Sequence, residues 1–506
     1  MTSARRADGP VAISSLDIPG GPELLVHGCE DCACAITGER AAPARGAAAD
    51  LAGDDRWVCG EGVIELPVDS EHRLLFDTLG GGAVVVNAGA YAIFGSFRQR
   101  PGAAGPPSGA ASGDRAAATI RCLRQAELIH PAGQARRPAF APGRTLTAWL
   151  HVTNSCNLLC PYCYLNKSGE GMDETTGRAA VGAVIRSAVD HGFASVKLKY
   201  AGGEASLNHR LVLSLHEHAR ELAARHGLGL YATLLSNGAA LPLSLVRSLH
   251  AAGIKVMISL DGIGALHDAQ RPFTTGRPSF AHVERGIARL IEHDHAPHIS
   301  VTITGRNAAG VADVVRFCLA RNLTFSLNLF RDNDCAASFP DLRYEERAII
   351  SGLLGAFGAI EESLPRWSVL GSVLDRGQLL EPRQRSCGVG QDYVVIDQRG
   401  AVAKCHMEIE KTIGDVFTAD PLDLVRRDRS TALNLIADDK EGCRDCDWRY
   451  WCTGGCTVAT FRATGRYDVR SPNCNIYKAI YPPALRLEAL RILKYGRPGS
   501  GIIPEA

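Results

Sequence analysis

The chain has no long hydrophobic run, almost no net charge and no visible export signal. No apolar stretch approaches the roughly 18 residues of a membrane-spanning helix, so a membrane protein is not expected. Lysine plus arginine number 55 and aspartate plus glutamate 54, a balance that excludes a protein coating nucleic acid with positive charge. The arginines near the N-terminus precede no apolar segment, so no secretory signal is expected and the predicted compartment is cytoplasmic.

Against this background the 17 cysteines stand out. A reducing cytoplasm disfavours a disulfide framework, and cysteines there more often bind metal or carry out chemistry. Hydrophobic residues make up 46% of the 506 residues, which argues against a disordered chain. The length predicts roughly two to four domains.

The N-terminal region divides into an irregular segment, residues 1–62, and a small α+β module, residues 63–135. Strand-like runs at 63–68, 73–76 and 83–86 precede helical patterns at 90–97 and 117–129, which a Gly- and Pro-rich spacer at 101–114 separates. Strands followed by helices over so short a length indicate a module that could be of the winged-helix type.

Residues 145–335 alternate strand-like and helical patterns six times. The strand-like runs are 146–152, 196–200, 230–235, 256–260, 299–304 and 324–330. The helical patterns between them are 175–191, 207–226, 241–252, 280–293 and 309–321. Such alternation predicts parallel strands with right-handed crossovers, and hence an α/β fold: a partial (β/α)6 barrel of the TIM type, with its chemistry at the carboxyl ends of the strands. A helical linker, 336–380, a cysteine-rich region, 381–480, and a C-terminal tail, 481–506, follow.

The first cysteine group comes directly after the first of the six strands. The sequence CNLLCPYC places Cys156, Cys160 and Cys163 in a C-x3-C-x2-C spacing, so that three thiolates can converge on one centre. Thiolates are the usual ligands of iron–sulfur clusters and of zinc. Structural zinc sites need a fourth ligand, whereas three cysteines leave one iron of a 4Fe–4S cluster open to a substrate or cosubstrate.

This motif, with the aromatic Tyr162 before its last cysteine, resembles the radical S-adenosylmethionine (radical SAM) superfamily. Further residues at successive strand ends match the ordered motifs of that family. They are Gly202, Gly203, Glu204, Ser236, Asn237, Ser259, Asp261 and Arg271. The resemblance implies that the Gly-Gly-Glu segment contacts the methionine amino group of the cosubstrate. It also implies that Ser236, Ser259 and Arg271 are candidates for holding its ribose and carboxylate.

A second field of seven cysteines lies between residues 387 and 474. Seven thiolates exceed one four-ligand site, and the spacing C-x2-C-x5-C-x3-C does not match a zinc ribbon, although zinc remains an alternative. A region so poor in apolar runs is expected to need metal to hold its shape. The field resembles the SPASM domain, a C-terminal extension of radical SAM enzymes that modify peptides and proteins.

The SPASM resemblance implies two auxiliary clusters. The second auxiliary set comprises Cys443, Cys446, Cys452 and Cys474, and the first auxiliary set comprises Cys387, Cys405 and Cys456. Some family members have a further cysteine where this chain has Glu381, so the first cluster is expected to have an open iron or a non-cysteine ligand. In sulfatase-maturating enzymes an aspartate base follows the cysteine that matches Cys405. In this chain His406 occupies that position. It is a candidate proton acceptor, or alternatively only a hydrogen-bond partner, and the replacement of aspartate counts against formylglycine formation.

The remaining cysteines have weaker interpretations. An N-terminal group, Cys29, Cys32, Cys34 and Cys59, could bind a metal but lacks a histidine pattern, so its role stays open. Cys122 and Cys318 are expected to be buried small residues, and so is Cys335, which could alternatively lie near the substrate.

Together these features predict an oxidoreductive radical SAM enzyme with three 4Fe–4S clusters, S-adenosylmethionine as cosubstrate and a reductant such as flavodoxin or ferredoxin. The resemblance points to a ribosomally made precursor peptide, whose leader the N-terminal module would capture at a sheet edge. The expected product is an intramolecular cross-link, either a thioether or a carbon–carbon bond such as a cyclophane. The alternatives are maturation of a folded protein such as a sulfatase, a small-molecule radical reaction, and a noncatalytic zinc protein.

Overall fold

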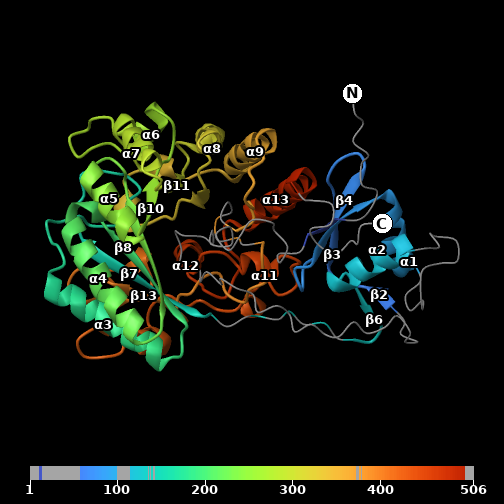
Figure 1. The fold of residues 1–506 in the computed structure, drawn as a ribbon, viewed down its shortest axis with the longest axis horizontal. Helices are drawn as coiled ribbons and strands as arrows, with labels where there is room; N and C mark the ends of the chain where they lie inside the picture. The colour runs from blue at the N-terminus through green and yellow to red at the C-terminus, as the bar shows by residue number, and fades with distance from the viewer. Residues whose placement is uncertain are drawn as a thin grey trace.

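The computed structural model describes residues 11–13, 57–99, 114–134, 143–371 and 379–495, together with residues 136, 138, 140, 375 and 377. Figure 1 shows an N-terminal module at one end, an α/β barrel at the other, and C-terminal helices between them. The predicted metal group at Cys29, Cys32 and Cys34 lies outside the described residues.

The six predicted barrel strands are confirmed. They are β7 (Thr145–Thr153), β8 (Ser195–Gly202), β9 (Gly229–Ser236), β10 (Lys255–Ser259), β11 (His298–Ile303) and β12 (Phe325–Leu329). They lie in chain order in one sheet and all pair in parallel. All nine residues of β7 are buried, as expected for a parallel sheet whose faces are both covered.

Helices connect these strands and cover the outer face of the sheet. They are α3 (Glu174–Asp190), α4 (His209–Arg225), α5 (Leu243–Ala252), α6 (Ala265–Gln270), α7 (Phe280–Glu292) and α8 (Val311–Ala320). Because each crossover joins adjacent parallel strands, the carboxyl ends of all six strands meet at the same edge. The predicted site residues follow these ends, so the fold gathers them on one side of the sheet.

The C-terminal region extends the barrel sheet, which the sequence did not indicate. Strand β13 (Tyr393–Ile396) pairs in parallel with β7, and β14 (Ala401–Ala403) and β15 (Gly414–Asp415) continue the sheet in antiparallel fashion. The sheet therefore has nine strands, ordered β12 to β7 and then β13, β14 and β15. The expected boundary between barrel and cysteine-rich region is thus bridged by backbone hydrogen bonds.

The C-terminal region also supplies helices. They are α9 (Glu346–Glu362), α10 (Pro421–Arg427), α11 (Arg449–Cys452), α12 (Thr457–Thr464) and α13 (Cys474–Tyr495). Helix α13 begins at the last predicted metal ligand and packs its buried face on α9. The predicted boundary between residues 480 and 481 therefore falls inside a helix, and 481–495 is part of the core rather than a tail.

The N-terminal module contains four antiparallel strands in the order β1 (Val11–Ile13), β5 (Ala83–Asn87), β4 (His72–Asp77) and β3 (Val63–Pro67). Helices α1 (Ala88–Gln99) and α2 (Asp114–Gln125) pack on this sheet, and β2 (Trp57–Cys59) pairs with β6 (Ile129–Pro131). Two expectations were wrong at the edges. The second helix ends at Gln125, because Glu127 turns the chain with φ 55° and Ile129 starts β6. The module also begins before residue 63, since β2 belongs to it.

The module docks on the cysteine-rich region through two tryptophans. Trp451 is fully buried, its indole N–H donates to the Thr78 carbonyl at 2.9 Å, and its ring lies 4.9 Å from that of Phe76. Trp448 also stacks against Phe76, at 6.1 Å. Because Trp451 directly precedes Cys452, the module is anchored beside the second auxiliary set.

We expect Trp451→Phe to lower the free energy of unfolding by about 1–3 kcal/mol, because the Thr78 carbonyl loses a buried donor. Thermal unfolding, with limited proteolysis to follow release of the module, measures the effect. Trp448→Phe is the matched control, as it trims a ring of the same interface. Equal losses for the two variants would show that ring packing, not the hydrogen bond to Thr78, anchors the module.

No helix among the described residues is both long enough and apolar enough to cross a membrane.

Candidate functional site: a cysteine-lined edge of the barrel

The loop 156–163, called the cluster loop below, leaves β7 at the carboxyl edge of the sheet. It is tied to the segment after α6: the Leu159 amide donates to the Pro272 carbonyl at 2.8 Å, and the Thr274 amide donates to the Asn157 carbonyl at 3.0 Å. The Lys167 ammonium donates to the Leu158 carbonyl at 2.6 Å. These contacts hold the three cysteines of the loop in one place.

The three thiols of the cluster loop form a donor set that fits an iron–sulfur cluster. Cys156, Cys160 and Cys163 lie within eight residues of one loop at this edge, and all three are partly buried. Burial raises the pKa of all three thiols, while the cations Lys167 and Arg271 oppose that rise. The 14 cysteines that the structure describes are all free of disulfides. An all-sulfur set beside two cations suits a cluster with anionic thiolates.

The Gly-Gly-Glu segment at the end of β8 contacts the protein itself. A Cβ at Gly202 would collide with the Thr153 carbonyl, and one at Gly203 with the Ser155 carbonyl, so both glycines permit close approach to the strand that carries the cluster loop. The sequence had suggested close approach to a ligand. In the structure, the two glycines approach the backbone carbonyls of Thr153 and Ser155.

Glu204, Ser236 and Asn237 are brought together, as predicted. The Glu204 carboxylate is 2% exposed and accepts from the Ser236 hydroxyl at 2.7 Å and the Asn237 amide at 2.6 Å. It also accepts from the Ser206 amide at 3.1 Å. The Asn237 side chain donates to Asn157 of the cluster loop at 2.7 Å. Glu204 thereby fixes the end of β9 against the loop, and its oxygens already have protein donors.

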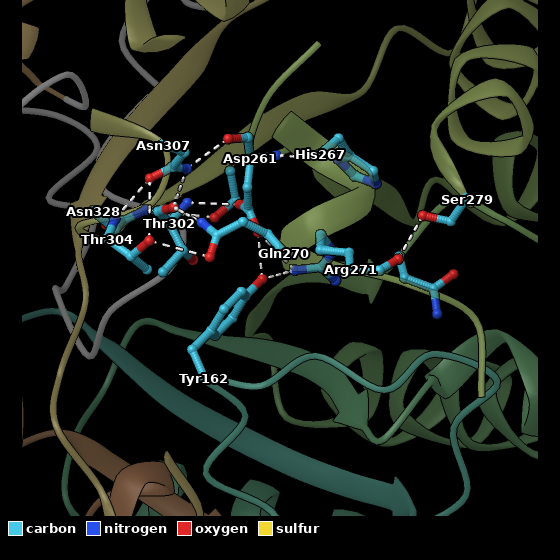
Figure 2. Close-up of polar contacts among 12 residues, drawn as sticks. Tyr162, Asp261, His267, Gln270, Arg271, Ser279, Thr302, Thr304, Asn307 and Asn328 are labelled. Atoms are coloured by element: carbon cyan, nitrogen blue, oxygen red, sulfur yellow. Dashed lines mark hydrogen bonds and ion pairs between the residues drawn. The ribbon is translucent and has the colours of Figure 1, made fainter. Parts of the chain in front are cut away.

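Tyr162, Asp261 and Arg271 form a buried network, shown in Figure 2. The Tyr162 hydroxyl donates to Asp261 Oδ2 and accepts from Arg271, whose guanidinium also pairs with Asp261 Oδ2 at 3.3 Å. Asp261 and Arg271 are 1% and 8% exposed. The aromatic residue of the cluster loop is therefore anchored to the end of β10. Ser259, the last residue of β10, is half-buried and stands two residues before Asp261.

Further residues lock Asp261 in place. Its Oδ1 accepts from the Thr302 amide at 2.8 Å, and its own amide donates to His267 Nδ1 at 3.3 Å. Burial and the nearby Arg271 lower the pKa of His267 to about 3, so the ring stays neutral. Figure 2 shows Asn307 joining the same network from the β11 side. The sequence motif named Asp261, but it did not reveal that Arg271 already has a carboxylate partner.

The first auxiliary set lies against the same apolar cluster as the cluster loop. Cys405 and Cys456 are buried in this cluster, and Cys163 and Cys387 pack against it. The Asn434 amide donates to the Cys387 carbonyl at 2.7 Å and approaches its sulfur at 3.6 Å. Cys163 and Cys405, which are about 240 positions apart in the chain, thus lie in the same apolar cluster.

The second auxiliary set is gathered in one part of the C-terminal region. Cys443 and Cys452 are buried, Cys446 is half-buried, and Cys474 begins α13. Burial raises the pKa of Cys443 to about 11 and that of Cys452 to about 12, so thiolates here need a metal or a cation. The assignment of these four cysteines to one cluster stays a prediction.

His406 occupies an aromatic box between the barrel and the first auxiliary set. Its ring stacks on Trp149 of β7 at 4.5 Å, and Tyr164 meets it edge-on at 5.7 Å. Its Nδ1 lies 3.0 Å from the Tyr393 hydroxyl on β13. The box comes from three distant segments, so a single sequence gave no signal for Trp149, Tyr164 or Tyr393.

Comparison with known proteins identifies the fold of the site. Residues 150–318 match the model of the Radical SAM superfamily. These residues form a radical SAM domain within the chain. The region that matches holds the cluster loop and the strand ends described above, which confirms the family resemblance of the sequence motifs.

This radical SAM protein is similar to several maturation enzymes. It is 24% identical over 351 residues to a PqqA peptide cyclase of Xanthomonas euvesicatoria, covering 65% of this chain and 87% of the relative. It is 22% identical over 336 residues to a cysteine-type anaerobic sulfatase-maturating enzyme of Clostridium perfringens, covering 60% of this chain and 86% of the relative. Other curated relatives match over shorter regions, where the chain spans 61%, 39% and 40% of their lengths.

Among solved structures, the radical SAM protein resembles native anSMEcpe with bound AdoMet and Cp18Cys peptide. The TM-score is 0.56 at 20% identity, covering 69% of this chain and 99% of that one. At this identity the likeness concerns the fold.

Proposed function

We propose that this radical SAM protein is a SPASM-type maturase that forms an intramolecular cross-link in a ribosomally made peptide. The observation that carries the proposal is the radical SAM domain with its three cysteines in the cluster loop, followed by seven cysteines in the C-terminal region that extends the same sheet. A 4Fe–4S cluster on Cys156, Cys160 and Cys163 would supply one electron to S-adenosylmethionine, yielding methionine and the 5′-deoxyadenosyl radical that takes a hydrogen atom from the substrate.

The chain's own residues orient the cosubstrate and exclude water. Arg271 and Tyr162 place polar groups beside the cluster loop, and Asp261 holds both in position. Ser236, Ser259 and Asn237 lie at strand ends around the same loop, where the ribose and carboxylate of S-adenosylmethionine are proposed to bind. The Glu204 carboxylate, with three protein donors, is assigned chiefly to holding the β9 end, and the methionine amino group would add a fourth contact.

Completion of a cross-link requires the removal of a second hydrogen. The substrate loses it as a proton and releases one electron, for which we propose the two auxiliary sets as acceptors. Cys443, Cys446, Cys452 and Cys474 supply four sulfurs, whereas Cys387, Cys405 and Cys456 supply three. The first auxiliary cluster is therefore proposed to have an open or non-cysteine position. His406, beside Cys405, is the proposed proton acceptor, and its contact with Tyr393 orients the ring.

A peptide substrate is supported by two observations. The PqqA peptide cyclase relative acts on a peptide, and the anSMEcpe structure holds one. The N-terminal module also contains an antiparallel sheet whose end strands are β1 and β3, since Val11–Ile13 of the chain itself pair with β5. We propose that the leader of the precursor adds a strand to this module.

Maturation of a folded protein is the second candidate, favoured by the alignment with the sulfatase-maturating relative over 60% of the chain. His406 argues against this candidate, because the resemblance places an aspartate at that position in sulfatase maturases.

The test is an anaerobic reaction with reconstituted protein, S-adenosylmethionine, a chemical reductant and the peptide encoded beside the gene. We expect 5′-deoxyadenosine and a peptide that has lost two hydrogen atoms, with a new cross-link in its fragmentation spectrum. Conversion of a sulfatase-derived peptide to an aldehyde instead would support the second candidate. Zinc without iron or sulfide in the purified protein would overturn both.

We expect reconstituted wild-type protein to hold about 11–12 irons per chain with equivalent sulfide, because three clusters carry about four irons each. Iron and acid-labile sulfide analysis measures this. Cys443→Ala with Cys446→Ala should remove about four of the irons. An iron content near four, unchanged in that variant, would contradict the auxiliary clusters.

A further inference from the structure

A buried lysine lies between the two auxiliary sets. Lys440 is 1% exposed and stands three residues before Cys443. Its backbone carbonyl accepts from the amides of Cys443 at 3.1 Å and Arg444 at 3.3 Å, so it begins the turn that presents the first cysteines of the second auxiliary set.

The segment between Cys452 and Cys456 is shaped around this side chain. The Lys440 ammonium donates to the Thr453 carbonyl at 2.8 Å. Thr453 is one of the few non-glycine residues with positive φ, at 52°, which is unfavourable for a β-branched side chain. A Cβ at the next residue, Gly454, would lie 2.6 Å from Lys440 Cδ and 2.9 Å from its Nζ. Gly454 also has a φ of 79°, so the backbone of this segment favours glycine and at the same time leaves room for the lysine side chain.

The position of Lys440 connects it to both cysteine sets. Its ammonium bonds to Thr453, on the short segment that joins Cys452 of the second auxiliary set to Cys456 of the first. A buried ammonium is costly without anionic partners, and clusters on these cysteines would supply negative charge. By contrast, the buried Lys404 ammonium in the same region pairs with the Asp428 carboxylate at 3.2 Å.

We propose that Lys440 is a positioning residue shared by both auxiliary clusters, and that its positive charge favours their reduced states. A cluster gains one negative charge when it takes up one electron, and a nearby buried cation stabilises that added charge. The proposal rests on the proposed function, which requires both clusters to accept an electron. According to the proposal, this one side chain raises the reduction potentials of both clusters together.

The test is an anaerobic redox titration of Lys440→Met, followed by the electron paramagnetic resonance signals of the two auxiliary clusters. At the wild-type midpoint of each cluster, we expect the ratio of reduced to oxidised cluster to fall at least tenfold. For a one-electron couple this equals a midpoint about 59 mV lower. Lys440→Arg keeps the charge and should stay within about twofold of wild type. Lys404→Met combined with Asp428→Asn removes a whole ion pair of the same region without changing the net charge, and should leave both ratios within about twofold of wild type.

Several results would overturn the proposal. Full iron content with unchanged ratios in Lys440→Met would do so, and a shift in one cluster alone would remove the shared role. If Lys440→Met binds fewer irons, the Lys440→Arg variant provides the test. Full iron content with a tenfold change in the ratio of reduced to oxidised cluster would show that side-chain geometry, not charge, sets that ratio, and would overturn the proposal. Absence of auxiliary iron from the wild-type protein would overturn the proposed function together with this inference. Full auxiliary iron with unchanged ratios would overturn the inference alone.

Discussion

Replacing Cys156, Cys160 and Cys163 together by alanine is expected to remove about four irons per chain and to abolish cleavage of S-adenosylmethionine. The reason is local: these three thiols are the ligands proposed for the cluster that cleaves S-adenosylmethionine, and the cations Lys167 and Arg271 act on all of them. Iron and sulfide analysis with chromatography of 5′-deoxyadenosine measures both effects. The auxiliary signals should survive, because their ligands lie on other segments.

Cys318→Ala is the matched control for this experiment. Cys318 is fully buried in α8 among apolar neighbours, so its replacement tests whether loss of any buried thiol lowers iron content. It should retain wild-type iron and activity. A triple variant that still cleaved S-adenosylmethionine would overturn the assignment of the cluster loop.

Asp261→Asn is expected to lower the free energy of unfolding by about 3–5 kcal/mol, the cost of leaving a buried charge without its partner. The substitution keeps the shape of the side chain, and an amide oxygen can still accept from the Thr302 amide. It removes the negative charge that balances Arg271, which is 8% exposed. Urea denaturation of the apoprotein measures the loss.

Tyr162→Phe is the control, because it removes a hydroxyl from the same network and leaves the ion pair intact. Its cost should be about 0.5–1.5 kcal/mol. Arg271→Met combined with Asp261→Asn should recover part of the stability lost in Asp261→Asn, since the unpaired charge disappears. No recovery in the double variant would show that packing, rather than charge balance, makes Asp261 important.

Much of the barrel could be predicted from the sequence because its signals are local. A buried parallel strand is a short continuous apolar run, and each of the six runs was found within a few residues of its observed bounds. The cluster loop could be predicted for the same reason, since its three ligands fall within eight residues and follow a strand. The order of the later motifs then placed Glu204, Ser236 and Asp261 at one edge.

The remaining features depend on contacts between distant segments. The pairing of β13 with β7 joins residues about 250 apart, and no periodic pattern specifies which strand a short apolar run will join. The aromatic box around His406 draws on three segments in the same way. Lys440 carried no signal, because a lysine in a polar region is ordinarily exposed, and only the folded chain shows it buried against the Thr453 carbonyl.

The continuity of the nine-stranded sheet fixes the distance between the cluster loop and Cys405. The cluster loop leaves β7 at Thr153, and Cys405 follows β14, which is bonded through β13 to that same strand. A hydrogen-bonded sheet resists stretching, so these two cysteine sites cannot separate by hinge motion as independent domains would. Under the proposed function, the distance that an electron crosses between these two sites would stay nearly constant during turnover. Movement that admits or releases the proposed peptide substrate would then come from the N-terminal module and the loops around the barrel edge.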